Sequence, residues 1–288
     1  MADHAFFGYS QETEPIPDID LSVPTVARTY DALRGGKDNF EADRMAAQII
    51  ESINPWAKVL VRQSRRFLSR AVGHVAGVLG IDQFIDVGSG MPTMENTHQI
   101  AQRHLPHARV VYVDTDPIVL AHSHALLADH VLTTAASGDV RDVDGILGCP
   151  EVNRLLDLDR PVCLMLVSLL HCIPDSDDPW GLVCRYFHRL VPGSVLILSH
   201  LASDDDAAAQ SLTTCIRELG MPWGHVRSPA DVERLFAGLE LLSPAVDDSV
   251  APMPVDCHTW RNEDAAPTPR PADPDQKIWE HAGVAVKP

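Results

Sequence analysis

The chain has 288 residues, of which 45% are hydrophobic and 22% are charged, as expected of a globular protein with a sizeable core. Its 40 acidic and 23 basic residues give a formal net charge of −17, which argues against nucleic acid or an anionic membrane surface as a partner. The longest apolar run, 161–167, is too short to cross a bilayer, and the N-terminus lacks the pattern of a secretory signal. We therefore expect a cytoplasmic protein.

The N-terminal quarter of the chain has a helical pattern after a polar start. Residues 1–21 are polar and contain prolines, so we expect a flexible tail. A first helix is predicted to begin with Ser22 as its N-cap, and Asp38 and Glu41 have the spacing of a capping box for a second. A third, long amphipathic helix follows. Residues 22–80 are therefore predicted to form a helical lid or N-terminal extension.

From residue 81 the pattern changes to short apolar runs that alternate with helical stretches. This alternation is typical of βαβ units and a parallel sheet, so 81–288 is predicted to be one Rossmann-like domain. The run 161–168 is apolar at nearly every position, as in a central strand covered on both faces. The expected strands are 83–87, 108–113, 130–136, 161–168, 194–200, 238–246 and 282–288.

The stretch "FIDVGSGMPT" joins the first of these strands to a glycine-rich turn. Gly88 and Gly90 allow positive φ and let a ligand approach the backbone at the start of a helix. A dinucleotide-binding loop has a third glycine or alanine where Thr93 stands here. Asp86, directly before the loop, would be unfavourable beside a pyrophosphate. S-adenosylmethionine has a positively charged sulfur and no pyrophosphate, so it suits this loop better.

Acidic residues also follow the next two strands. Asp114 ends the second strand, 24 residues after Gly90, where it can accept hydrogen bonds from ribose hydroxyls. Asp139 follows the third strand and is placed to bind an adenine amino group. Each acid has a competing interpretation as a turn or cap residue, and Asp116 competes with Asp114 for the helix cap before Pro117. The predicted cofactor-binding residues are Asp86, Gly88, Ser89, Gly90, Asp114, Thr115, Asp139, Val140 and Ser168.

Candidate catalytic residues are few, because methyl transfer needs mainly proximity and alignment. His171 follows the fourth strand at the ligand-binding edge, so we expect it to contact the acceptor or act as a base. A packing role is the competing interpretation. Tyr30 is the second candidate, in the polar segment 30–44, which is predicted to fold over the cofactor and help form the acceptor pocket. The alternative for that segment is a capped helical turn that merely covers the sheet.

Other site chemistry is not indicated. The six cysteines contain no CxxC pair, so we expect reduced thiols rather than disulfides or zinc ligands. The histidines of "HSH" at 122–124 point to different sides of a helix, and we predict no metal site. The sequence does not indicate an oligomeric state.

Taken in order, these motifs resemble class I S-adenosylmethionine-dependent methyltransferases. More narrowly, the chain is similar to a bacterial "S-adenosyl methyltransferase" family, formerly a domain of unknown function. The resemblance extends from about residue 22 to 288, and Pro92 departs from the class pattern, in which a third loop glycine is common. Its motifs are the stretches 24–44, 84–93, 108–127, 138–142 and 282–288.

The resemblance implies a seven-stranded, mostly parallel sheet with the last strand antiparallel, a helical N-terminal lid, and S-adenosyl-L-methionine as cofactor. It assigns Asp86, Gly88 and Gly90 to the methionine part, Asp114 to the ribose and Asp139 to the adenine. Our first hypothesis is therefore a methyltransferase acting on a small-molecule acceptor. The alternative is a non-catalytic adenosyl-ligand binder with a regulatory role. A nucleotide-sugar or NAD-dependent enzyme is the third hypothesis, which Thr93 and Asp86 disfavour.

Overall fold

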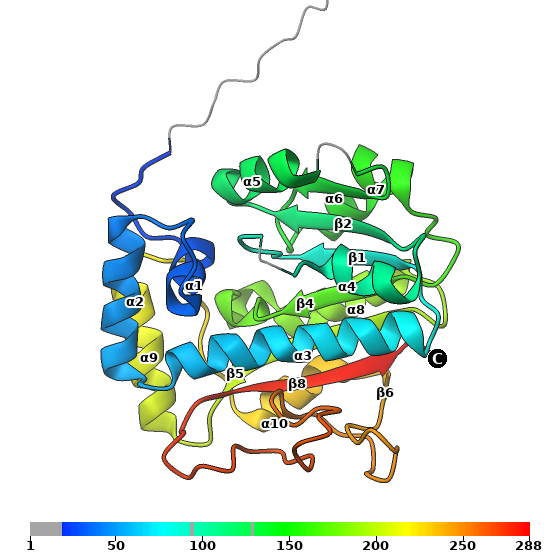
Figure 1. Cartoon of the computed structure of the whole chain (residues 1–288). Helices are drawn as coiled ribbons and strands as arrows, with labels where there is room; N and C mark the ends of the chain where they lie inside the picture. The colour runs from blue at the N-terminus through cyan, green and yellow to red at the C-terminus, as the bar shows by residue number, and fades with distance from the viewer. Residues whose placement is uncertain (1–18, 93–94, 128–129) are drawn as a thin grey trace, which may run out of the picture.

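A central eight-stranded β-sheet forms the frame of the computed structural model, which describes residues 19–92, 95–127 and 130–288 (Figure 1). Most of the predicted tail, and Thr93, lie outside these described residues. The strands are β1 (Gln83–Val87), β2 (Arg109–Asp114), β3 (Thr133–Ser137), β4 (Cys163–Val167), β5 (Val195–Ala202), β6 (Glu240–Leu241), β7 (Val255–Asp256) and β8 (Trp279–Val286).

The strand order is β3-β2-β1-β4-β5-β8-β6, and β7 pairs with β8. Strands β1 to β5 are parallel, whereas β8 is antiparallel to its neighbours β5 and β6. The predicted parallel sheet with an antiparallel last strand is confirmed. One difference is that the strand expected over 238–246 is reduced to Glu240–Leu241, because Pro244 has no N–H to continue the ladder. The two-residue β7 was not predicted.

Helices cover both faces of the sheet, and the strand side chains alternate between two cores. In β1, Phe84 packs with α3 and α4 on one face, and Ile85 packs with α6, α7 and α8 on the other. This double burial explains why the central strands are apolar at successive positions. The covering helices are α3 (Ala57–Gly77), α4 (Thr97–His104), α5 (Pro117–Leu127), α6 (Val143–Gly148), α7 (Pro150–Leu155), α8 (Pro179–Arg189) and α10 (Pro229–Glu233).

A second group of helices lies at the end of the sheet toward which the parallel strands point (Figure 1). It consists of α1 (Val26–Arg34), α2 (Glu41–Ile53) and α9 (Asp206–Glu218), with α2 packed against both α1 and α9. The chain after β4 and before β6 contributes short 3₁₀ turns, which are η1 (Leu170–Cys172), η2 (Asp175–Asp177) and η3 (Arg234–Phe236). The carboxyl edge of the sheet is therefore covered by α1 and by the turn after β4.

Both predicted caps of the N-terminal helices are wrong in position. The first helix begins at Val26 with Thr25 as its N-cap, because the Ser22 hydroxyl donates to Asp20 instead. The capping box of α2 is also displaced, since Asp43 rather than Glu41 accepts from the backbone at the helix start. The physical reason for the second displacement is that Asp43 belongs to a buried network.

That network centres on the ion pair between Arg28 of α1 and Asp43 of α2. Both side chains are buried, and Arg28 Nε lies 3.2 Å from Asp43 Oδ1 and 3.1 Å from Oδ2. The same carboxylate accepts from the backbone N–H of Thr25 at 3.1 Å and of Phe40 at 2.9 Å. A single carboxylate thus fixes the start of both helices and their relative position.

Asp31 has a similar role one turn further along. Its buried carboxylate accepts hydrogen bonds from Arg34 at 2.5 Å, the Asp38 N–H at 3.0 Å and the Asn39 amide at 2.8 Å. Helix α1 ends at Gly35, which is in the left-handed conformation at φ 83°. The polar character of this segment therefore has a structural explanation in the turn between α1 and α2.

Two further features bear on earlier expectations. All six cysteines are free thiols, two of them buried. Among the described residues, no helix combines the length and the apolar composition that a membrane span requires.

Breaking the Arg28–Asp43 pair tests the role of this network in stability. We expect Asp43→Ala to lower the free energy of unfolding by about 3 kcal/mol, because a buried guanidinium loses its counter-ion. Lys58→Ala, which removes a half-exposed ion pair with Glu51, should cost less than about 1 kcal/mol. Urea denaturation of both variants measures the contrast, and equal losses would contradict the structural role of the buried pair.

Candidate active site

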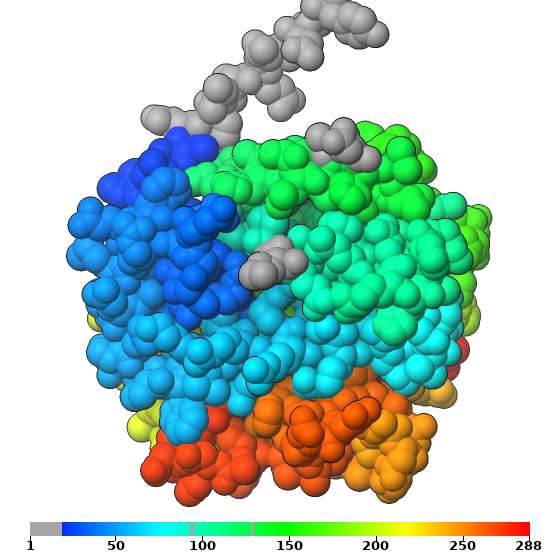
Figure 2. All heavy atoms as spheres, in the orientation of Figure 1, coloured from blue at the N-terminus to red at the C-terminus, as the bar shows by residue number. Residues whose placement is uncertain are grey.

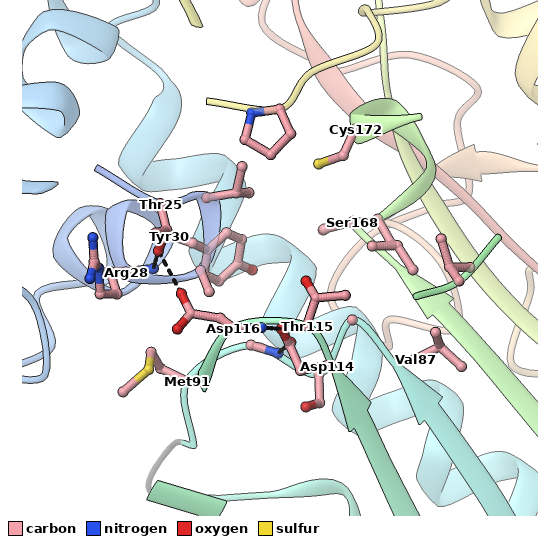
Figure 3. A pocket seen from close by; sticks show the side chains of 18 of the residues that line it. Thr25, Arg28, Tyr30, Val87, Met91, Asp114, Thr115, Asp116, Ser168 and Cys172 are labelled. Atoms are coloured by element: carbon pink, nitrogen blue, oxygen red, sulfur yellow. Dashed lines mark hydrogen bonds between the residues drawn. The ribbon is translucent and has the colours of Figure 1, made fainter. Parts of the chain in front are cut away.

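A cavity of about 690 Å³ lies at the carboxyl edge of the sheet, bounded on one side by α1 (Figure 3). Strand order reverses between β1 and β4, so the loops that follow these strands diverge and leave a crevice there. The space-filling view shows the surface hollowed between the N-terminal helices and the segment around α5 (Figure 2). The predicted site residues that line the cavity are Tyr30, Asp86, Gly88, Ser89, Gly90, Asp114, Thr115, Asp139, Val140 and Ser168.

The turn after β1 brings its backbone against the cavity. Gly88 has φ 68° and Gly90 has φ 64°, a conformation that side chains disfavour. A Cβ atom at Gly88 would lie 2.5 Å from Leu169 Cδ1, so a side chain at this position would also require Leu169 to shift. The Gly88 N–H donates to the carbonyl of Val113 at 2.8 Å, which fixes the turn to the end of β2.

Two buried carboxylates form the floor of the cavity. Asp86 accepts a hydrogen bond from Thr97 Oγ1 at 2.7 Å, yet burial raises its pKa to about 6 against the opposing effects of Thr97 and Arg65. Asp114 accepts from the backbone N–H of Gly90 at 2.8 Å and of Asp116 at 3.0 Å, and burial raises its pKa as well. Burial makes the negative charges of both groups energetically costly. A cationic ligand bound between them would offset that cost.

The competition between the two acids after β2 is settled by their contacts. Asp116 caps α5 by accepting from the Ile118 N–H at 2.9 Å, whereas Asp114 lies beside the glycine turn. Asp116 has a second contact, because its other oxygen accepts from the Thr25 hydroxyl at 2.8 Å (Figure 3). That bond connects the start of α1 to the loop after β2, across the cavity. The sequence pattern gave no sign of it.

Asp139 lies at the rim and is half-exposed. Arg141 binds both of its oxygens, with Nη2 2.6 Å from Oδ2, and this contact lowers the pKa of Asp139. Arg141 also reaches Asp177 at 3.0 Å and so connects the rim to η2. Val140, next along the chain, is buried, and its carbonyl accepts from Tyr186 at 3.0 Å. The carboxylate of Asp139 is ionised and partly available to a ligand.

The two candidate catalytic residues have different surroundings. His171 is buried and does not line the cavity; its Nδ1 lies 3.3 Å from the Leu201 N–H, and its ring packs against Trp223 with centroids 4.6 Å apart. Burial lowers the pKa of His171 to about 3, so the ring is neutral. Tyr30 lines the cavity, but its hydroxyl donates to the carbonyl of Val61 at 3.2 Å and burial raises its pKa to about 12.

The placement of His171 corresponds to the packing role that competes with its catalytic interpretation. We therefore do not carry His171 into the proposed mechanism. The cavity also contains residues that the sequence did not single out, among them Arg141, Cys172 and Trp223. Each lies in a turn between regular elements, where no periodic pattern marks a residue as facing a ligand.

The raised pKa of Asp86 predicts a pH-dependent stability. This pKa is about 6 in the folded chain, against an ordinary value of 3.8, so ionisation costs stability as the pH rises through this interval. We expect the free energy of unfolding of Asp86→Asn to exceed that of the wild type by up to about 3 kcal/mol at neutral pH, and this advantage to disappear as the pH falls below 3.8. Chemical denaturation across this pH range measures the difference. The exposed control Asp264→Asn should show none, and a gain independent of pH would contradict the prediction.

Comparison with known proteins agrees with this geometry. The sequence matches the S-adenosyl methyltransferase family over residues 12–288, whereas no curated protein matches the chain. A crystal structure of a protein from Thermobifida fusca YX, assigned as a methyltransferase, is 41% identical and has a TM-score of 0.83; the match covers 96% of this chain and 99% of that one. A DUF574 family protein from Streptomyces avermitilis MA-4680 is 36% identical with the same TM-score, over 93% of this chain and 99% of its own.

These matches confirm the resemblance seen in the sequence motifs, the class I fold and S-adenosyl-L-methionine as cofactor. The chain belongs to the S-adenosyl methyltransferase family.

Proposed function

We propose that this chain transfers the methyl group of S-adenosyl-L-methionine to a small-molecule acceptor held in the cavity beside α1. The observation that carries the proposal is that the lining of the cavity contains two chemically different sets of residues. The acidic part of the lining consists of the acids that follow β1, β2 and β3. The apolar part of the lining consists of side chains that are not among the predicted cofactor residues: Val26, Leu169, Ile173, Pro222 and Trp223.

The acidic part fits the cofactor. S-adenosyl-L-methionine supplies, when bound, a methyl group activated by a positively charged sulfur. Asp86 and Asp114 are buried carboxylates whose charge is disfavoured by burial, so a cationic ligand offsets that cost. The turn at Gly88 and Gly90 has no side chain to obstruct the ligand. We assign Asp86 and this turn to the methionine part of the cofactor.

The adenosyl part is assigned to the ends of β2 and β3. Both oxygens of Asp114 already accept one backbone N–H, and each retains a lone pair for a ribose hydroxyl. Thr115 lies beside it in the same loop (Figure 3). Asp139, held by Arg141, has an ionised carboxylate for the adenine amino group, and Val140 offers an apolar contact to the ring.

The apolar part favours an enzyme over the alternative of a non-catalytic binder. A protein that only senses the cofactor has no need of space beyond it, whereas methyl transfer requires the acceptor to lie in line with the methyl group. Leu169 and Trp223 belong to the apolar lining, and we propose that they bound this additional space. The formal charge of −17 also favours a diffusible small molecule over a nucleic acid as the acceptor.

We further propose that the helical extension, residues 22–80, acts as a lid. Its α1 contributes Thr25, Arg28 and Tyr30 to the cavity wall, and Thr25 bonds to Asp116 of the opposite wall. In this arrangement α1 keeps water from the reacting groups and holds the acceptor in place.

Binding of S-adenosylhomocysteine tests the cofactor assignment. We expect calorimetric binding to the wild type, loss of affinity in Asp114→Ala, and no comparable binding of NAD. At about 100 times Kd the ligand should stabilise the fold by about 2.7 kcal/mol, which a thermal melt detects. Asp264→Ala, an exposed loop variant, is the matched control. Equal affinity in Asp114→Ala and the control would contradict the ribose assignment, and absence of binding to the wild type would refute the proposed function.

Removal of the Thr25 hydroxyl tests the lid. Thr25→Val loses the bond to Asp116 and the cap of α1, so we expect faster dissociation of S-adenosylhomocysteine in stopped-flow displacement, by about tenfold for a lost charge-assisted bond. Thr25→Ser retains the hydroxyl and should behave as the wild type. If the two variants release the ligand equally fast, the hydrogen bond between Thr25 and Asp116 does not slow ligand release.

A further inference from the structure

Ser168 has an unusual conformation at the edge of the cavity. It follows directly after β4 with φ 54°, a region that non-glycine residues occupy at a cost. Its N–H donates to the Ser199 carbonyl and lies 3.1 Å from the Ser199 hydroxyl, and its hydroxyl is 2.8 Å from that of Ser64 on α3. Ser168 lines the cavity opposite α1 (Figure 3). These hydrogen bonds hold Ser168 in its strained backbone conformation and fix the position of its hydroxyl.

The hydroxyl of Ser168 donates a hydrogen bond to Glu280 on β8. Ser168 Oγ donates to Glu280 Oε1 at 2.7 Å, and the glutamate is 3% exposed. Its other oxygen, Oε2, is buried and has no hydrogen-bond partner among the described residues. Burial raises the pKa of Glu280 to about 7, against the opposing effect of the Ser168 hydroxyl, so the group exchanges its proton near neutral pH.

A purely structural role explains this arrangement poorly. An amide would bind the Ser168 hydroxyl equally well, whereas a buried carboxylate with one unpaired oxygen costs stability. Only the hydroxyls of Ser168 and Ser199 lower the pKa of Glu280, and no neighbouring positive charge offsets its negative charge among the described residues. Burial keeps the neighbouring phenol and thiols protonated, and the nearby Asp256 is itself an acid. The titratable groups that face it are Tyr30 on α1, Cys172 on η1, and Asp256 and Cys257 at β7.

We propose that Ser168 and Glu280 form a proton relay for an acceptor that carries an O–H or N–H group. The inference rests on the proposed methyltransferase function and names the chemical class of its acceptor. Ser168 contacts the acceptor, and Glu280 acts through Ser168. His171 and Tyr30 take no part, since one is outside the cavity lining and the other donates to a backbone carbonyl.

The proton moves over two short steps. Ser168 Oγ donates its hydrogen bond to Glu280 and accepts one from the Ser64 hydroxyl. It therefore retains one lone pair for the hydrogen of the methyl acceptor. As the acceptor oxygen or nitrogen forms its bond to the methyl group, its hydrogen passes to Ser168 and the Ser168 hydrogen passes to Glu280. The bond from methyl to sulfur breaks and its electron pair stays on sulfur. After product leaves, Glu280 returns the proton to water through Ser168.

The relay predicts which acceptors are methylated. A hydroxyl or an amine loses a proton on methylation and gains from a base, whereas a thioether has no such proton and gains nothing. The apolar wall at Leu169 and Trp223 favours an acceptor with an apolar body. Phenols and aromatic amines combine both features.

Infrared titration of the full chain with bound S-adenosylhomocysteine tests the relay without turnover. We expect a carboxylic-acid band that is lost with a midpoint near pH 7 and that is absent in Glu280→Gln. In Ser168→Ala the midpoint should rise, because a bond to the carboxylate is lost. Asp256→Asn is the matched control, in which the band should remain and shift to lower pH. A band unchanged by Glu280→Gln, or a midpoint in the ordinary carboxyl range, would overturn the relay.

Methylation of a panel of phenols and aromatic amines, with thioethers of equal size for comparison, supplies the second measurement. We expect kcat/KM to rise about tenfold per pH unit below about pH 7 and then level off, and to fall about 100-fold in Glu280→Gln with loss of this profile. Glu280→Asp should recover part of the rate. A wild-type profile in Glu280→Gln, or turnover of thioethers alone or of no panel member, would overturn the inference. Failure of S-adenosylhomocysteine to bind would instead refute the proposed function.

Discussion

The cost of burying carboxylates at one edge of the sheet is the constraint on which the rest of the structure depends. Parallel strands bring the loops after β1, β2 and β3 to the same edge, so their acids gather there whatever their distance in sequence. Burial raises the pKa of Asp86 to about 6 and that of Asp114 in the same direction. The fold is therefore less stable with these two carboxylates than it would be with neutral side chains. A cationic cofactor would offset this cost, so the residues that weaken the fold alone are those to which we propose the cofactor binds.

The helices that cover this edge of the sheet bury several polar side chains, and each of these needs hydrogen-bond partners. Arg28 and Asp43 are buried as a pair, and Asp31 accepts three hydrogen bonds in the turn after α1. These contacts make α1 and α2 a unit with few free polar groups. Only then can α1 lie over a cavity with an acidic floor and touch the opposite wall through the hydroxyl of Thr25. The polar segment 30–44, for which the sequence predicted a role at the acceptor pocket, in large part holds α1 and α2 together.

The antiparallel strand β8 adds a feature that the parallel strands do not have. It inserts next to β5 and places Glu280 beside Ser168, although 112 residues separate them in sequence. The glutamate lies behind the cavity wall, and Ser168 is the side chain between it and the cavity. This layered arrangement separates a titrating group from solvent while leaving it one hydroxyl away from a ligand, which suits proton transfer at neutral pH.

The sequence alone determined the sheet and its acids, because strand periodicity and a strand-end position are local properties. The order of apolar runs predicted the strands, and the residues Asp86, Gly88, Gly90 and Asp114 lie at the cavity where the motif placed them. Only the tertiary structure decided matters that depend on distant partners. Asp43, not Glu41, caps α2 because it also binds Arg28. His171 packs against Trp223 and does not line the cavity, whereas Glu280 lies beside Ser168. No local pattern specifies which side chains meet when β8 joins the sheet, since packing chooses among many compatible neighbours.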